Sequence, residues 1–302
     1  MLNTFNLGFS LFFVKLILVM YMAENRKELE KMDYMEPECV LCDRPVGFKQ
    51  KKQMIPQQRI SQKVDELMAR NEFTEVERMF KYWLEEAKVN YDEQGEFMLY
   101  NEMMGFYRKT GKKEEGYAAV DKAMSMLDEL GYRDSVSGAT CYTNAATVYT
   151  SFKDYERSLP LFEKAKVIYE NNVKNNEYKL ASLYNNMALA LVGLKKFEEA
   201  NDLYNKAIET VNNCENGELE IAMTYLNMLD ALISEKGICE EIDEQATMLL
   251  YQAQCMLDTE SLPRDDYYAY VLDKCVSIYE FFGWNGYAKE LRERIRKINE
   301  RA

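Results

Sequence analysis

The chain has 302 residues, of which 47% are hydrophobic and 29% charged, a balance typical of a folded protein with a substantial core. Acidic residues outnumber basic ones by 51 to 38, and the net charge of −13 disfavours general binding to nucleic acid. Histidine and Gly-rich phosphate loops are absent, which excludes triad hydrolases, HExxH zinc enzymes and P-loop enzymes. We therefore expect no catalytic residue, no metal ion and no cofactor, although a carboxylate-based enzyme is a class that composition leaves open.

The chain begins with a strongly apolar segment, residues 5–22, which Lys15 interrupts near its middle. About 18–20 apolar residues can span a bilayer, but a lysine at the centre of a span costs about 2.5–3.5 kcal/mol. Three interpretations of this segment stay open: a start assigned too early, an uncleaved membrane anchor, and a secretory signal. If the start is assigned too early, translation begins at Met22, Met32 or Met35. We expect contact with a membrane only through residues 5–22.

Residues 23–56 are predicted to form an irregular segment that carries two cysteines, Cys39 and Cys42, in a CxxC spacing. A tetrahedral zinc site needs four ligands, and neither a second such pair nor a histidine lies within reach. Zinc shared between two chains and a redox dithiol are the alternatives to two plain thiols. Pro37 and Pro45 break any three-helix DNA-binding unit here, so a DNA-binding regulator is disfavoured. The other cysteines are expected to be free thiols in a reducing cytoplasm.

The central part of the chain is self-similar, and three stretches of it align without gaps: residues 97–126, 139–168 and 181–210. In each stretch large, apolar and small side chains recur on one face of a first helix. After a short polar break, small and large side chains alternate on one face of a second helix. The tyrosines that set this 42-residue register are Tyr100, Tyr142 and Tyr184. The pattern predicts stacked helix pairs, because no pair can bury both of its apolar faces alone.

Weaker copies of the pattern flank these three stretches. Residues 58–90 fit it upstream, and residues 222–256 fit it downstream, although the second helix there is out of frame by a few residues. A last pair is expected over residues 265–300, with a polar, basic final helix that suits the end of a stack. We interpret its basic residues as a solvated helix end rather than a docking patch. About six helix pairs are therefore predicted over residues 57–302, after a hydrophobic segment at residues 1–22.

This pattern resembles the tetratricopeptide repeat, in which large, apolar and small positions follow one another over two helices. The usual repeat is about 34 residues long. The 42-residue period seen here is similar to the longer repeats of kinesin light chain and of bacterial peptide-sensing regulators. The resemblance implies an all-α, right-handed superhelical solenoid of about six antiparallel helix pairs, whose first helices line a concave groove. It also implies a non-enzymatic scaffold for protein–protein interaction.

A set of polar residues stands where first-helix side chains should face this groove, two residues after each first-helix aromatic or beside that position. An asparagine amide offers both a donor and an acceptor, so it can pair with the backbone of an extended peptide. Kinesin light chain and the bacterial sensors resemble this chain in having groove asparagines that bind peptide backbones. The alternative is that these asparagines hydrogen-bond to neighbouring helices. The candidate peptide-binding residues are Asn101, Glu102, Asn144, Asn186 and Asn227.

The expected partner is a protein or an extended peptide. Chaperone-docking tetratricopeptide domains resemble this chain in having an asparagine at the Asn144 position, but they need basic groove residues to clamp a carboxylate. The corresponding positions here are Asn101, Gly105, Ser182 and Asn186. A neutral or basic peptide is therefore predicted. A self-associating assembly protein and a membrane-tethered adaptor are the alternatives, and the sequence leaves the oligomeric state open.

Overall fold

The computed structural model describes residues 54–172, 174 and 176–300 of the chain. These residues form twelve α-helices and one 3-10 helix, and the described part of the chain contains no strand. Residues 1–22, together with Cys39 and Cys42 of the CxxC sequence, lie outside the described residues. Among the described helices, none combines the length and the apolar character that crossing a membrane requires.

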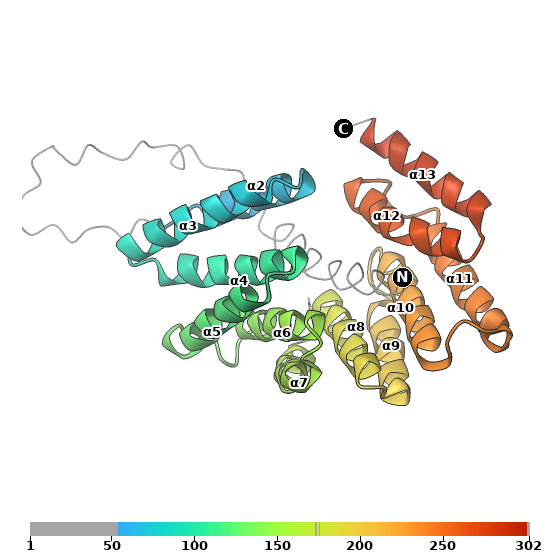
Figure 1. The fold of residues 1–302 in the computed structure, drawn as a ribbon, viewed down its shortest axis with the longest axis horizontal. Helices are drawn as coiled ribbons and strands as arrows, with labels where there is room; N and C mark the ends of the chain where they lie inside the picture. Colours follow the sequence, from blue (N-terminus) through green and yellow to red (C-terminus); the bar gives the residue numbers. More distant parts are fainter. Residues whose placement is uncertain (1–53, 173, 175, 301–302) are drawn as a thin grey trace, which may run out of the picture.

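The twelve helices form six antiparallel pairs, which confirms the predicted all-α solenoid (Figure 1). Each first helix packs on the second helix of its own pair and on the next pair along the chain. The pairs are α2 (Gln57–Ala69) with α3 (Phe73–Val89), α4 (Glu93–Thr110) with α5 (Lys113–Glu129), α6 (Val136–Ser151) with α7 (Tyr155–Asn171), α8 (Glu177–Gly193) with α9 (Phe197–Val211), α10 (Glu218–Lys236) with α11 (Asp243–Leu257), and α12 (Asp266–Phe281) with α13 (Asn285–Asn299).

Tight turns join the two helices of most pairs. In the α6–α7 turn Lys153 has a left-handed backbone with φ of 63°, and Asp154 N donates to Tyr149 O at 2.9 Å. The α8–α9 turn repeats this geometry with Lys195 at φ of 61°. A left-handed residue after the last helical turn satisfies carbonyl groups that would otherwise lack donors. The turns therefore fix how closely the two helices of a pair approach each other.

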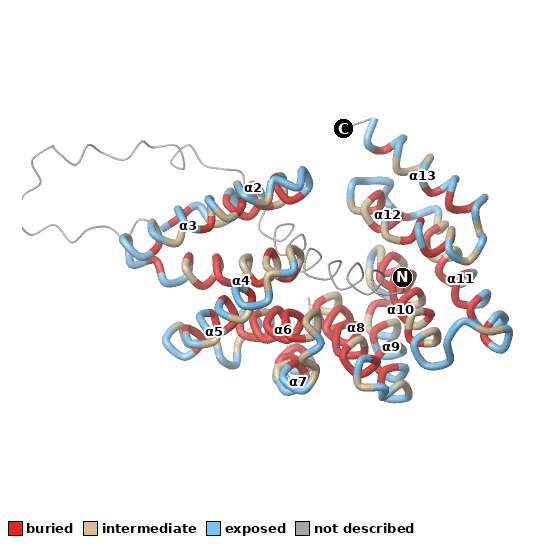
Figure 2. Tube along the Cα trace, viewed as in Figure 1, coloured by how far each residue is buried: buried red, intermediate tan, exposed pale blue. Residues whose placement is uncertain are grey.

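The small first-helix positions of the repeat lie where helices cross. Met104, Ala146 and Ala188 are each completely buried. Around them, buried side chains gather into three hydrophobic clusters, one at α2–α4, a central one that extends from α4 to α10, and a C-terminal one from α10 to α13. Figure 2 shows that the buried residues lie along the faces where the helices meet. The core therefore consists of three clusters between first and second helices, and partly buried residues that pack on two clusters link each one to the next.

The fifth pair departs from the regular pattern. Residues 237–242 connect α10 to α11, and they include the 3-10 helix η2 (Glu240–Ile242). By comparison, only residues 152–154 separate α6 from α7. The longer connection explains why the second helix of this repeat is out of frame in the sequence. Ile242 is 1% exposed, so it anchors the connection in the core.

The stack curves so that α4, α6, α8, α10 and α12 line its inner, concave side, and α5, α7, α9, α11 and α13 lie outside (Figure 1). The two ends of the arc come within electrostatic reach of each other. Burial raises the pKa of Tyr270 on α12 to about 12, while Arg108 on α4 lowers it and Asp65 on α2 raises it. Side chains from the first two pairs and the last pair therefore share one electrostatic environment.

Candidate functional site

The first asparagine contact on the concave side joins α4 to α6. Asn144 Nδ2 donates to Asn101 Oδ1 at 3.1 Å, and Asn101 Nδ2 donates to Phe97 O of its own helix at 2.9 Å. Asn144 is 7% exposed and Asn101 is half-buried. The structure therefore brings these two predicted site residues together, and it uses their amides to bridge neighbouring first helices.

A second bridge joins α8 to α10. Asn227 Nδ2 donates to Asn185 Oδ1 at 3.1 Å, and Asn185 Nδ2 donates to Thr224 Oγ1 at 3.0 Å. Both asparagines are completely buried. Asn185 was not among the residues predicted from the sequence. A signal for it exists, since a strict 42-residue step back from Asn227 leads to Asn185 rather than to Asn186.

Three asparagine oxygens on successive first helices have no hydrogen-bond partner among the described residues. They are Oδ1 of Asn144 on α6, of Asn186 on α8 and of Asn227 on α10. Asn186 is 2% exposed, and its Nδ2 donates to Ser182 O of its own helix at 2.9 Å. An asparagine oxygen can accept two hydrogen bonds, so each of these atoms retains acceptor capacity.

Glu102 lies at the N-terminal side of this face, on α4. Ser61 Oγ of α2 donates to Glu102 Oε1 at 2.7 Å. Burial raises the pKa of Glu102 to about 7, although the Ser61 hydrogen bond lowers it and the nearby Asp65 raises it further. Glu102 therefore lies apart from the asparagine contacts and interacts instead with the first pair.

A second buried carboxyl group, Glu220 on α10, was not predicted from the sequence. Tyr267 OH of α12 donates to Glu220 Oε1 at 2.7 Å, and burial raises the pKa of Glu220 to about 7. Glu220 Oε2 has no hydrogen-bond partner among the described residues. The one sequence signal for it is an acidic residue between the apolar Leu219 and Ile221.

The described residues offer hydrogen-bond acceptors on this face rather than a reactive constellation. They contain no group of three Cys, Asp or Glu side chains arranged to hold a metal ion. The five cysteines of the described chain are free thiols. Burial raises the pKa of Cys141 to about 12 and that of Cys275 further still, so both stay protonated at neutral pH. Chemically, the arrangement can accept hydrogen bonds from the donor groups of a bound molecule.

Comparison with protein families gives one match within the chain. Residues 142–213, which extend from α6 to just beyond α9, match the tetratricopeptide repeat family. The matched residues contain the whole of the stretch at 181–210 and all but the first three residues of the stretch at 139–168. Comparison with curated proteins gives no match.

Solved structures resemble the chain in fold. The structure of BtubC (BKLC) from P. vanneervenii aligns with a TM-score of 0.54 at 16% identity, over 66% of this chain and 78% of that protein. A tetratricopeptide repeat protein from Parabacteroides merdae ATCC 43184 aligns over 80% of this chain and 98% of its own, at 16% identity and a TM-score of 0.39. Only the first of these similarities is strong enough to support the assignment of a repeat solenoid.

Proposed function

We propose that this chain, a tetratricopeptide repeat protein, is a non-enzymatic scaffold that binds an extended peptide or protein segment along its concave face. Tetratricopeptide folds generally mediate protein–protein interaction, because curved stacks of helix pairs present long concave surfaces. The proposal adds the location of the binding surface, the middle of the face between α6 and α10, and the chemistry that binds there.

The observation that carries this proposal is the row of unpaired acceptors, Oδ1 of Asn144, Asn186 and Asn227. These oxygens are buried in the free chain, so each side chain must turn towards the groove before a peptide can reach it. A buried acceptor without a partner costs about 1–3 kcal/mol, and a backbone N–H that reaches it removes that cost. Neighbouring packed helices lie roughly 8–10 Å apart, and an extended chain advances about 3.3 Å per residue. A peptide lying across α6, α8 and α10 would therefore present an N–H to successive asparagines at about every third residue.

The acidic groups of the concave side favour a neutral or basic peptide. Glu102 and Glu220 lie towards the two ends of the asparagine row, and burial also raises the pKa of Asp230 on α10. A cationic side chain placed near any of these carboxyl groups stabilises its ionised form and gains a charge-assisted hydrogen bond. An acidic peptide would instead add negative charge beside carboxyl groups whose pKa is already raised by burial.

The test compares the full chain with its Asn144→Ala/Asn186→Ala variant as bait for partners from native lysate, followed by affinity measurement on the isolated partner peptide. The matched control is Asn171→Ala/Asn213→Ala, which removes two exposed asparagines, one at the end of α7 and one just after α9, away from the concave face. We expect the concave variant to lose the partner and the control variant to retain it, with both folded by circular dichroism. Equal binding by both would contradict the proposal. A mass that rises with concentration, without any partner, would favour self-association.

A further inference from the structure

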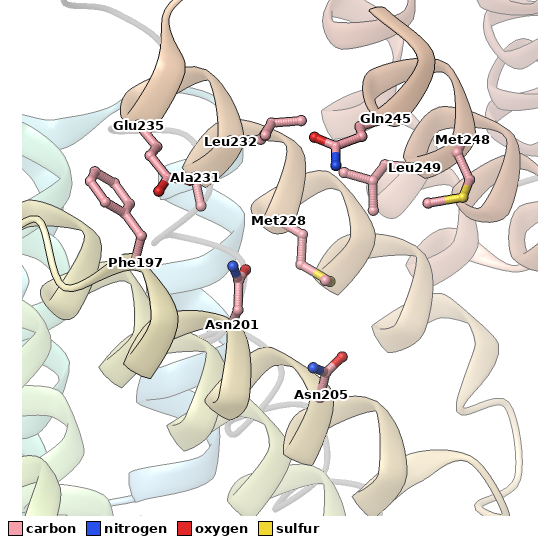
Figure 3. A pocket seen from close by; sticks show the side chains of 10 residues that line it. All are labelled: Phe197, Asn201, Asn205, Met228, Ala231, Leu232, Glu235, Gln245, Met248 and Leu249. Atoms are coloured by element: carbon pink, nitrogen blue, oxygen red, sulfur yellow. The ribbon is translucent and has the colours of Figure 1, made fainter. Parts of the chain in front are cut away.

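A pocket of about 310 Å³ opens on the outer side of the stack, away from the concave face (Figure 3). Its floor is formed by α10 with Met228, Ala231 and Leu232. The helices α9 and α11 form its two walls, and both pack on α10. The longer connection at residues 237–242 is specific to this repeat among those described, and it places α11 at the pocket's far wall.

The lining runs for about two helical turns. On α9 Asn201 and Asn205 lie four residues apart, and Figure 3 shows both side chains pointing across the opening towards α10 and α11. On α10 Met228 and Glu235 lie seven residues apart. At 1.5 Å per residue these spans correspond to roughly 6–11 Å of helix. A channel with an apolar floor, bounded by two helices, matches the shape that an amphipathic helix fills in helix-in-groove recognition.

Apolar surface continues from the pocket along α11. Met248 lines the pocket and is 53% exposed, and Tyr251, three residues later on the same face, is 60% exposed. Each of these side chains exposes more than half of its surface, so a partner that covers it removes apolar area from water and gains binding free energy. The combined surface could therefore accept two bulky apolar side chains spaced one turn apart.

The charge around the pocket is one-sided. Residues 195–263, which include every residue that lines the pocket, contain fifteen acidic residues and four basic ones. This region therefore contributes −11 of the chain's net charge of −13. Glu235 lines the pocket itself, and η2 and the first turn of α11 add four acidic side chains beside it. A partner with basic residues beside its apolar face would be attracted to this region and oriented by it.

We propose that the pocket between α9, α10 and α11 is a second docking site, and that its occupant is a basic amphipathic helix of a partner protein. Two apolar side chains of that helix enter the pocket and cover Met248, and its lysines or arginines lie against Glu235 and the acidic start of α11. Asn201 and Asn205 offer hydrogen bonds to its polar edge. This site is independent of the concave face, so the protein would hold two partners at once.

The probe for this site is a fluorescein-labelled 16-residue peptide of leucine and lysine, with leucines at i, i+3, i+4 and i+7. Its binding to the full chain is measured by fluorescence anisotropy. The variant Met248→Lys places a charge at the pocket. The matched control is Val167→Lys, on the outer helix α7, where the side chain is 55% exposed. Both variants add one positive charge, so a difference between them reports the site and not the net charge.

We expect the wild-type chain and Val167→Lys to bind the peptide equally, and Met248→Lys to bind it about tenfold more weakly. The lysine removes an apolar contact and places a positive charge against the basic peptide, and the two effects together should reach the 1.4 kcal/mol that a factor of ten requires. A counterpart peptide with glutamate in place of lysine should not bind. Hydrogen exchange should slow in α9 and α11 when the lysine peptide is present. Equal weakening by both variants, binding of the glutamate peptide, or absence of binding by the wild-type chain would overturn the proposal.

Discussion

Glu220 is a single buried carboxyl group that contributes to the pH dependence of the whole fold. It is 1% exposed, it accepts one hydrogen bond from Tyr267, and its burial raises its pKa from 4.5 to about 7. The native state therefore holds this proton more tightly than the unfolded state does. As a result, Glu220 lowers the free energy of unfolding as pH rises from about 4.5 to about 7, and no further above that range.

The variant Glu220→Gln removes this titration while the amide oxygen still accepts from Tyr267. We expect it to be more stable than the wild-type chain at pH 8 by on the order of 1–3 kcal/mol, and about equally stable at pH 4.5. Urea unfolding followed by circular dichroism at the two pH values measures this difference. Glu209→Gln, an exposed change on α9, serves as the control and should leave the profile unchanged. An identical pH profile for Glu220→Gln and the wild-type chain would show that this carboxyl group is not the source.

Asn185 should contribute more to the stability of the fold than the other concave-side asparagines do, because its amide nitrogen and oxygen both have partners on α10. Its removal leaves Asn227 Nδ2 buried without an acceptor. We expect Asn185→Ala to lower the free energy of unfolding by about 1–3 kcal/mol. Asn201→Ala, an exposed change on α9, should stay within about 0.5 kcal/mol of the wild-type chain. Denaturant unfolding of the two variants measures both values, and equal stability would contradict the bridging role.

The asparagines also mark the limit of what the sequence predicts at this scale. The amphipathic register places Asn144, Asn186 and Asn227 on first helices, and the structure has them there. Their partners depend on the relative rotation of neighbouring helices, and a shift of one residue decides whether Glu102 or Asn101 meets Asn144. Periodicity within one helix contains no information about that rotation. Whether these residues bind a peptide stays a prediction.

At the scale of a helix, the start of α6 depends on a glycine. Ser135 caps this helix by accepting from Gly138 N at 3.1 Å, and a Cβ at Gly138 would overlap the carbonyl oxygen of Tyr132 in the preceding loop. Alanine normally stabilises a helix relative to glycine by about 1 kcal/mol, but overlap with backbone cannot be relieved by a rotamer change. We expect Gly138→Ala to lower the melting temperature.

The matched control is Gly286→Ala at the start of α13, where an added Cβ would meet no atom of the described residues within 4 Å. There the higher helix propensity of alanine should dominate, and we expect the free energy of unfolding to rise by about 0.5–1 kcal/mol. Differential scanning calorimetry should show melting-temperature shifts of opposite sign for the two variants if the close approach of Gly138 to Tyr132 determines the effect of Gly138→Ala. A gain in both would show that the loop at Tyr132 moves aside.

The connection at residues 237–242 illustrates what the sequence indicates about an element and what it leaves out. The loss of register in the fifth repeat is visible in the sequence, and the structure shows its cause as a longer connection containing η2. The pocket beside this connection could not be predicted, because it depends on how far α11 lies from α9 once both have packed on α10. That distance results from packing between three helices and not from the pattern of any one of them.

At the scale of the whole molecule, the fold follows from the sequence more closely than the site does. Buried small residues such as Ala146 and Ala188 recur with the period that predicts the stacking. Each pair therefore contacts only its neighbours along most of the chain. The closeness of Arg108 and Tyr270 was not predicted, because it results from small rotations that accumulate over all the pairs.

A stack of this kind should lose stability locally when one pair is weakened. Leu272 on α12 is completely buried in the C-terminal cluster, and Leu183 on α8 is completely buried in the central one. Changing either leucine to alanine should lower the free energy of unfolding by about 2–5 kcal/mol.

Because stability in a repeat stack spreads through neighbouring interfaces, we expect Leu272→Ala to accelerate hydrogen exchange in α10–α13 and to leave α4–α7 unchanged. Leu183→Ala should accelerate exchange on both sides of α8. Mass-spectrometric hydrogen exchange on the full chain distinguishes the two patterns. A uniform acceleration by both variants would show instead that the six pairs unfold as one cooperative unit, held together by contacts between the two ends of the arc.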